Sequence, residues 1–338
     1  MRGSLDASRR CVNSISVVQK PVRRELERVQ AHLRRLFRTP IPILNEVGGH
    51  VLAPRGKKFR PTMLLLTARL RGNAGRDAVT AATVVEMVHA AALIHDDSVD
   101  RSGLRRGVPT VNGLWTDEMA IIMGDYLYAQ AMATLVTHKL DPAMGILARV
   151  VTQMSCGEAL EFQYAYDTSV TEAQYEELIL AKTGSLIGAA TEIATWLGPR
   201  PADPRHRQRF RRFGETVGVA FQVVDDLFDY LAEPAVTGKP VGADLADGKI
   251  TLPLIAALRL ATEKDRKTLR ALALRKRWSP AQWERLRTLI ERAGGFAYAR
   301  QRAQALAEEA RGLLNGERPG PARVALDHAI DYAVHRDH

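Results

Sequence analysis

The stretch His95-Asp96-Asp97-Ser98-Val99-Asp100 closes an apolar run that extends from Val84 to Ile94. The run is long for a strand and rich in alanine, which favours helices over strands, so it predicts a helix. On a helix, Asp96 and Asp100 are four residues apart and share one face. Because like charges on one face repel each other, a cation is expected between them. Oxygen ligands without a nearby cysteine favour Mg²⁺.

The same pattern returns in Phe221-Gln222-Val223-Val224-Asp225-Asp226-Leu227-Phe228-Asp229, which again ends an apolar helical run with an Asp-Asp-x-x-Asp motif. Asp225 and Asp229 share a face, as Asp96 and Asp100 do. A single acidic helix end is more often a solvated surface than a metal site. Two copies, both on apolar helices, favour a pair of metal-binding clusters.

The bulk composition predicts a globular protein with a sizeable core. The chain has 338 residues, enough for one large domain or two ordinary ones, and 46% of them are hydrophobic. Its two cysteines, Cys11 and Cys156, exclude a disulfide framework and a cysteine-based zinc site, which fits a reducing cytoplasm. No apolar run is expected to be a membrane span, and the start lacks an apolar signal core.

The net charge of +10 permits a nucleic-acid or anionic-membrane partner without requiring one. Much of the positive charge lies in residues 1–40, and from Pro21 onward this segment has helical periodicity. We predict an amphipathic helix packed on the body with a basic outer face. Attraction to a membrane surface is the alternative. Residues 1–19 lack a pattern and are expected to form a loose tail, which leaves a domain over residues 20–338.

Helix punctuation recurs along the rest of the chain. Asp141-Pro142, Thr171-x-x-Gln174 and Ser279-Pro280 are typical of helix starts, and Gly294-Gly295 and Pro319-Gly320-Pro321 are typical of breaks. There is no convincing run of alternating strands and no glycine fingerprint for a dinucleotide. The sequence therefore predicts an all-α protein, a single bundle of ten or more helices.

Basic, glycine-containing loops alternate with the acidic clusters. They are Arg55 to Pro61, Arg101 to Gly107, Lys182 to Ser185, and Gly238 to Lys249. Glycine lets the backbone approach a ligand, and lysine and arginine form charge-assisted bonds to phosphate oxygens. A site for metal-bound diphosphates requires this combination, because metal ions bridge carboxylates to phosphate and the cations neutralise the remaining charge.

Taken together, these landmarks resemble the trans-prenyltransferases of the polyprenyl diphosphate synthase family. The resemblance covers about residues 40–255, in the family's order. It rests on Gly56-Lys57-Lys58-Phe59-Arg60-Pro61, His89, Asp96 to Asp100 with Arg105-Arg106-Gly107, Gly124-Asp125-Tyr126-Leu127, Gly157-Glu158, Lys182-Thr183, Phe221 to Asp229, and Gly238-Lys239 to Gly248-Lys249.

The resemblance implies a bundle around a central deep cavity in which both clusters face each other. It assigns about three Mg²⁺ ions, held on an allylic diphosphate, to Asp96, Asp97, Asp100, Asp225, Asp226 and Asp229. It assigns contacts with the allylic diphosphate to Arg105, Lys182, Lys239 and Lys249. It implies that the diphosphate of isopentenyl diphosphate is held by Lys57, Arg60, His89 and Arg106. It also implies that Thr183 and Gln222 line the region where the substrates react.

The implied reaction is repeated condensation of isopentenyl diphosphate with an allylic primer, farnesyl or geranylgeranyl diphosphate. In the family, large side chains one to two turns before the first aspartate stop chain growth. Here Met87, Val88, Ala91 and Ala92 occupy that region, so a medium or long all-trans product of the kind found in quinone side chains is expected. The family is usually homodimeric.

Three other interpretations stay open at this stage. The chain could be the active subunit of a two-component synthase, or a terpene cyclase with the same metal chemistry. It could also be a basic nucleic-acid-binding protein, although that class does not explain six clustered aspartates. A cyclase has no need of an isopentenyl diphosphate site, so Lys57, Arg60, His89 and Arg106 argue against it.

Overall fold

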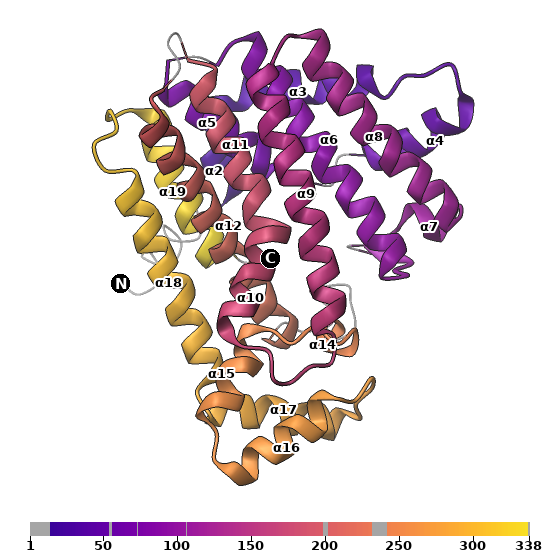
Figure 1. Cartoon of the computed structure of the whole chain (residues 1–338), viewed down its shortest axis with the longest axis vertical. Helices are drawn as coiled ribbons and strands as arrows, with labels where there is room; N and C mark the ends of the chain where they lie inside the picture. The colour runs from indigo at the N-terminus through magenta and orange to yellow at the C-terminus, as the bar shows by residue number, and fades with distance from the viewer. Residues whose placement is uncertain are drawn as a thin grey trace, which may run out of the picture.

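The computed structural model describes residues 14–53, 56–72, 74–105, 107–198, 202–231 and 242–336. Within these ranges the regular structure is almost wholly helical, which confirms the predicted all-α class (Figure 1). The strands found there form one short hairpin, in which β1 (Leu104–Arg105) pairs antiparallel with β2 (Val108–Pro109). This hairpin directly follows the first aspartate cluster.

The amino-terminal part begins with a short helix where a loose tail through residue 19 was expected. That expectation is wrong for the last residues of the segment, because Val18 is fully buried and the Gln19 side chain donates to the Lys57 carbonyl at 2.8 Å. These contacts are tertiary, so five residues suffice for a helix without a sequence pattern. The elements here are α2 (Ile15–Gln19), η1 (Lys20–Val22), α3 (Arg23–Leu36), α4 (Pro42–Val51) and α5 (Phe59–Leu70).

Helix α3 has the predicted amphipathic character, since Leu26, Val29 and Leu33 are buried while its basic residues are mostly exposed. It packs on the first of two hydrophobic core clusters, which also contains buried side chains of α5 and of the long helices beside it. Those helices are α6 (Arg76–Val99), α8 (Asp117–Thr137), α9 (Asp141–Tyr164) and α11 (Ser185–Trp196), with the short α7 (Val111–Leu114) between α6 and α8.

Two of these helices, α6 and α8, are long and apolar enough to cross a membrane by length and composition alone, contrary to the expectation from the sequence. In α6, 72% of the most apolar window is buried inside the protein, which identifies a core helix. In α8 the buried share is only 39%, so one side of that helix is an exposed apolar face.

The second core cluster lies in the carboxy-terminal half, and α16 and α17 form the lower end of the molecule in Figure 1. The remaining elements of the carboxy-terminal half are α10 (Glu172–Ile179), η2 (Leu180–Gly184), the 28-residue α12 (Pro204–Leu231), α14 (Ala243–Ala246), α15 (Leu252–Leu260), α16 (Glu263–Ala273), α17 (Pro280–Arg292), α18 (Gly295–Leu313) and α19 (Pro321–His335).

Helix boundaries follow the predicted capping signals closely. The Thr171–Gln174 capping box is formed, and Ser279 and Gln282 make a second one at the start of α17. Helix α9 begins at Asp141 with proline in its first turn, but Leu140 rather than Asp141 is the N-cap. Gly294 separates α17 from α18 with φ +86°, a conformation that favours glycine.

Helix α12 belongs to both clusters, because Phe210 and Phe213 pack in the first and Val223 and Leu227 in the second. The second aspartate motif is therefore carried on a helix anchored at both ends. The first motif ends α6, just beyond the buried Ile94. Both motifs thus belong to well-packed helices, which restricts the positions of their backbones.

Candidate active site

The first aspartate cluster occupies the last turn of α6 and its C-cap. Asp97 is buried, and its Oδ1 accepts a 2.7 Å ion-paired hydrogen bond from Arg105 Nε in β1. The Asp97 carbonyl accepts from the Ser102 amide at 2.8 Å, which closes the loop that brings Arg105 back to the helix end. Arg105, predicted from the resemblance alone, therefore lies directly beside the first cluster.

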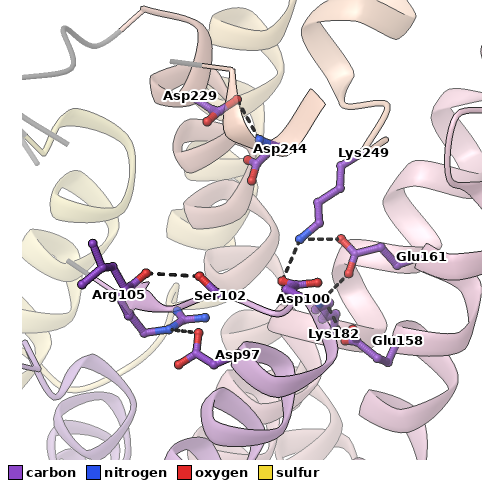
Figure 2. A network of polar contacts seen from close by, with 11 residues as sticks. Asp97, Asp100, Ser102, Arg105, Glu158, Glu161, Lys182, Asp229, Asp244 and Lys249 are labelled. Carbon is purple, nitrogen blue, oxygen red and sulfur yellow. Dashed lines mark hydrogen bonds and ion pairs between the residues drawn. The ribbon is translucent and has the colours of Figure 1, made fainter. Parts of the chain in front are cut away.

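Two lysines from distant parts of the chain converge near the same helix end (Figure 2). Lys182 Nζ pairs with Glu158 at 2.8 Å and with Glu161, both on α9. Lys249 Nζ pairs with Asp100 at 3.3 Å and with Glu161 at 3.5 Å. Glu161 therefore bridges both lysines, and Lys249 connects it to the first aspartate cluster.

Burial and the charges of this network shift the pKa values of its carboxyl and amino groups. Burial raises the pKa of Asp96 to about 7, although Lys182 pulls it down and Glu158 pushes it further up. Burial alone would lower the pKa of Lys249, but Glu161 and the surrounding aspartates raise it well above its ordinary value. The pKa of Lys182 is raised as well, against burial, chiefly by Glu161. Both lysines are thus held as cations where an anion could approach.

The segment from Gly242 to Lys249 joins the first cluster to the second. Asp229 Oδ2 on α12 accepts from the Asp244 amide at 3.3 Å, and the Lys249 amide donates to the Asp244 carbonyl at 2.9 Å. Because Lys249 Nζ pairs with Asp100, this segment connects Asp229 to Asp100 through three successive contacts (Figure 2). The two motifs, more than a hundred residues apart in sequence, therefore meet at one site.

In the second cluster, Asp226 is held from two sides. Its carboxylate accepts from Tyr175 Oη at 2.6 Å and from Gln222 Nε2 at 2.8 Å, and Gln222 Oε1 accepts from Thr183 Oγ1 at 2.9 Å. Burial raises the pKa of Asp226 to about 7, and burial likewise keeps Tyr175 protonated by raising its pKa. Thr183 and Gln222 are therefore in contact, as the predicted reacting region requires.

Lys182 and Thr183 lie in η2, a single turn of π-helix between α10 and α11. Such π-bulges are frequent at functional sites because the extra residue per turn redirects side chains. Gly184 and Gly218 allow η2 to approach α12 closely, since a Cβ on Gly218 would lie 2.7 Å from the Gly184 Cα. This close approach brings Thr183 within reach of Gln222.

Asp225 is paired with an arginine near the end of the chain. Arg336 Nη2 contacts Asp225 Oδ1 at 2.5 Å and the Phe221 carbonyl at 2.9 Å, and the guanidinium lies 3.5 Å from the centre of the Phe221 ring. Arg336 is buried. Ion pair, hydrogen bond and cation–π contact together fix the outer edge of the second cluster.

Two of the four residues predicted to bind isopentenyl diphosphate contact each other directly. Arg60 Nη1 lies 2.9 Å from His89 Nε2, so these two side chains meet. Lys57 Nζ lies 5.5 Å above the Tyr332 ring. Lys58, the N-cap of α5, has φ +47°, an uncommon conformation for a residue with a side chain. Backbone strain of this kind is often found at ligand-binding loops.

Two predicted residues, Arg106 and Lys239, lie outside the described residues. Their assigned contacts with the two diphosphates stay predictions. His95, which directly precedes the first cluster, has a structural role, because its Nε2 forms a 3.2 Å hydrogen bond with the Ile121 carbonyl oxygen. A Cβ on Gly124 would lie 2.2 Å from that nitrogen, so glycine is required there.

Sequence reasoning missed several residues of the site. Glu158 and Glu161 were assigned no contact from the sequence, yet they hold Lys182 and Lys249. Their three-residue spacing on an apolar helix was a usable signal. Glu86 lies one turn before His89, and burial raises its pKa while Arg60 and Lys58 lower it. Other missed partners, which no sequence pattern marks, are Tyr175 and Arg336.

The donor set of both clusters fits a hard divalent cation, since it consists of carboxylate oxygens, with Asp226 held by hydrogen bonds. Within the described ranges, no three Asp, Glu, His or Cys side chains are already arranged around a common ion position. Instead, Asp97, Asp100 and Asp225 each pair with a lysine or arginine.

Comparison with known proteins identifies the family of this chain. The family model described as polyprenyl synthetase matches residues 41–290. An all-trans-nonaprenyl-diphosphate synthase of Rhodobacter capsulatus is 35% identical over 86% of this chain and 88% of its own. A short chain isoprenyl diphosphate synthase of Methanothermobacter thermautotrophicus is 32% identical over 86% and 89%.

Among solved structures, a polyprenyl synthase from Caulobacter crescentus, complexed with calcium and isoprenyl diphosphate, superimposes with a TM-score of 0.90. It is 30% identical to this chain, and the alignment covers 96% of this chain and 98% of that one. The likeness therefore extends over the whole fold, both aspartate motifs included. The chain belongs to the polyprenyl synthetase family and is a trans-prenyltransferase.

Proposed function

We propose that this enzyme condenses isopentenyl diphosphate repeatedly with an allylic diphosphate, to give a medium- or long-chain all-trans polyprenyl diphosphate. The observation that carries the proposal is the single network in which both aspartate clusters meet Lys182 and Lys249. Acids for metal ions and cations for phosphate oxygens lie within one site, as ionisation of an allylic diphosphate requires.

The divalent cation is proposed to be Mg²⁺, about three ions per site, held by the six aspartates. Bound there, it would neutralise the diphosphate and act as a Lewis acid on the leaving oxygen. Arg105, Lys182 and Lys249 would donate to the same diphosphate as its carbon–oxygen bond breaks.

The chain's own groups would also stabilise the allylic cation that forms. Thr183 donates its hydroxyl hydrogen to Gln222, so the lone pairs of Thr183 Oγ1 are free to face positive charge. The double bond of isopentenyl diphosphate, held by Lys57, Arg60 and His89, then forms the new carbon–carbon bond. The departing diphosphate accepts the proton that is lost, so no side-chain base is needed.

Product length is proposed from the α6 side chains. Ala91 and Val88 are buried and Ala92 is half-buried, and neither alanine has the bulk to floor a growth channel beside α6. The relatives alone do not determine the product length, because they include both a nonaprenyl and a short-chain synthase. A quinone side chain is the proposed use of the product.

A homodimer is proposed, with the exposed apolar face of α8 as its contact surface. Ile121, Ile122 and Val136 on this helix are 50%, 52% and 58% exposed. A second copy would bury the same face on both subunits in a twofold arrangement. We further propose a cytoplasmic enzyme whose basic α3 face contacts membranes peripherally, and no nucleic-acid partner.

The test is to incubate the purified chain alone with Mg²⁺, isopentenyl diphosphate and farnesyl or geranylgeranyl diphosphate, and to measure product length. A ladder ending at one size supports the proposal. Binding of both substrates without elongation would indicate a missing partner subunit, and diphosphate release without elongation would indicate a terpene cyclase. The Asp97→Asn variant serves as the inactive control.

A further inference from the structure

A second basic cavity lies far from the active site, between α3, the beginning of α6 and the residue that follows α8. Its volume is about 340 Å³, room for roughly ten water molecules. Arg76, the first residue of α6, lines it, whereas Asp96 to Asp100 lie at the opposite end of this 24-residue helix. At a rise of about 1.5 Å per residue the two ends are roughly 36 Å apart.

Five of the eight residues that line this cavity are arginine or histidine. Arg28, Arg35, Arg76, His32 and His138 line it, together with Ala31, Val79 and Thr80, and the lining contains no carboxylate. Among the described residues, no Asp or Glu lies within ion-pair distance of the three arginines. The nearest acids of α3 have other partners, since Glu25 pairs with Arg69 at 2.6 Å and Glu27 with Arg23 at 3.4 Å.

His32 distinguishes this cavity from an ordinary solvated arginine cluster. Its residue is only 7% exposed, and its Nδ1 has a single long contact, 3.4 Å to Thr83 Oγ1. Burial lowers the pKa of His32, and Arg35, His138 and Arg76 lower it further. A buried polar ring thus faces concentrated positive charge that nothing in the described protein neutralises.

The beginning of α6 adds to the positive potential. The first backbone amides of an α-helix lack intrahelical partners, and the helix dipole favours an anion there. The three arginines are exposed residues, but their guanidiniums, two imidazoles and a long helix start surround one concave site. Phosphate is the anion whose geometry suits several guanidiniums at once.

We propose that this cavity, lined by His32 and by Arg28, Arg35, Arg76 and His138, binds a phosphate-bearing anion at a site separate from the active centre. The ligand is either a free phosphate or diphosphate, or the phosphate headgroup of an anionic lipid. The inference does not depend on the product or the substrates of the prenyl transfer.

The experiment follows the ring signals of His32 and His138 by NMR of protein labelled at histidine Cε1, during addition of inorganic diphosphate without Mg²⁺. These rings report on this cavity and not on the active site. Saturable shifts of both signals are expected. In Arg35→Gln/Arg76→Gln the affinity should fall by about tenfold for each arginine. Wild-type prenyl transfer by this variant would show that it is folded.

The charge-matched control is Arg270→Gln/Arg300→Gln, which removes two exposed arginines outside both the cavity and α3. It should bind diphosphate as the wild type does. Equal weakening in both double variants would overturn the proposal, because it would reveal non-specific charge attraction. Signals that do not respond to diphosphate or to lipid would overturn it as well.

Co-sedimentation with phosphatidylglycerol vesicles separates the two sources of phosphate. Vesicle binding that Arg35→Gln/Arg76→Gln loses and the control double variant retains identifies a lipid headgroup. Diphosphate binding in the cavity without vesicle binding identifies a free anion.

Discussion

Replacing Asp226 by asparagine should stabilise the metal-free protein at alkaline pH, even though it removes a metal ligand. Asp226 is 3% exposed, and burial, with Asp244 adding to it, raises its pKa from 3.8 to about 7. Between these values the folded protein holds a proton that the unfolded chain has lost. The free energy of unfolding therefore falls as pH rises through this window and levels off above about 7.

The size of the effect follows from the shift. Each pKa unit corresponds to about 1.36 kcal/mol, and from pH 5 to about pH 7 the folded protein holds the Asp226 proton that the unfolded chain has lost. The free energy of unfolding of the wild type should therefore fall by about 3 kcal/mol over this range. Asparagine cannot ionise, and its carbonyl oxygen can still accept from Gln222 while its amide nitrogen donates to the Tyr175 hydroxyl oxygen. The stability of Asp226→Asn relative to wild type should thus rise by about 3 kcal/mol from pH 5 to pH 8.

The assay is urea unfolding in EDTA at both pH values, with the shift in midpoint converted through the common slope. Asp125→Asn, which removes a carboxylate whose side chain is 71% exposed, controls for loss of charge. Mg²⁺ should stabilise the wild type more at pH 8 than at pH 5, because ligating carboxylates must be ionised. A stability difference between Asp226→Asn and wild type that is independent of pH would refute the reasoning.

Other substitutions test the remaining parts of the site. Ala92→Phe should shorten the product by at least one isoprene unit, measured by chromatography of the dephosphorylated prenols, whereas Ala91→Phe should also destabilise the protein by about 1–3 kcal/mol because Ala91 is fully buried. Unchanged length in Ala92→Phe would exclude growth along α6. Glu161→Gln should raise KM for the allylic diphosphate several-fold by loosening Lys182 and Lys249, and an unaltered KM would assign Glu161 to stability alone. Ile122→Glu should halve the molecular mass measured by light scattering, because a charge on the α8 face would prevent dimerisation. A variant that stays dimeric would show that the subunits meet through another surface.

The fold was largely predictable because its signals are local. Helical periodicity marked α3, a capping box marked α10, Ser279-Pro280 marked the start of α17, and Asp-Asp-x-x-Asp marked the functional ends of α6 and α12. Helix α2 escaped notice because its stability depends on burying Val18 and on Gln19 reaching across to α5, and neither contact leaves a periodic trace in the chain.

The residues that pair with the aspartates were less predictable, because the spacing of residues in the sequence does not show which side chains meet across the fold. Tyr175 is 51 residues from Asp226, and Arg336 is 111 residues from Asp225. A tyrosine on a helix and an arginine near the chain end are ordinary residues in sequence. Tyr175 and Arg336 reach the aspartates only because α10 and α19 pack against α12.

These pairings neutralise three of the six aspartates before any substrate arrives. Arg105 neutralises Asp97, Lys249 neutralises Asp100, and Arg336 neutralises Asp225. Once the aspartates accept divalent cations, their former partners lack a counterion, and a diphosphate can take the vacated place. A divalent cation alone would leave the basic side chains without a counterion, and a diphosphate alone would leave the aspartates without one.

We therefore expect divalent cation and diphosphate to bind cooperatively, each raising the affinity for the other by the same factor. Titration calorimetry with a non-reactive allylic diphosphate analogue, with and without Mg²⁺, measures that factor. Lys249→Gln should reduce it, because Asp100 would then have no cation to release. Independent binding of the two ligands would mean that the ion pairs do not exchange, and that the aspartates and the basic side chains act as separate sites.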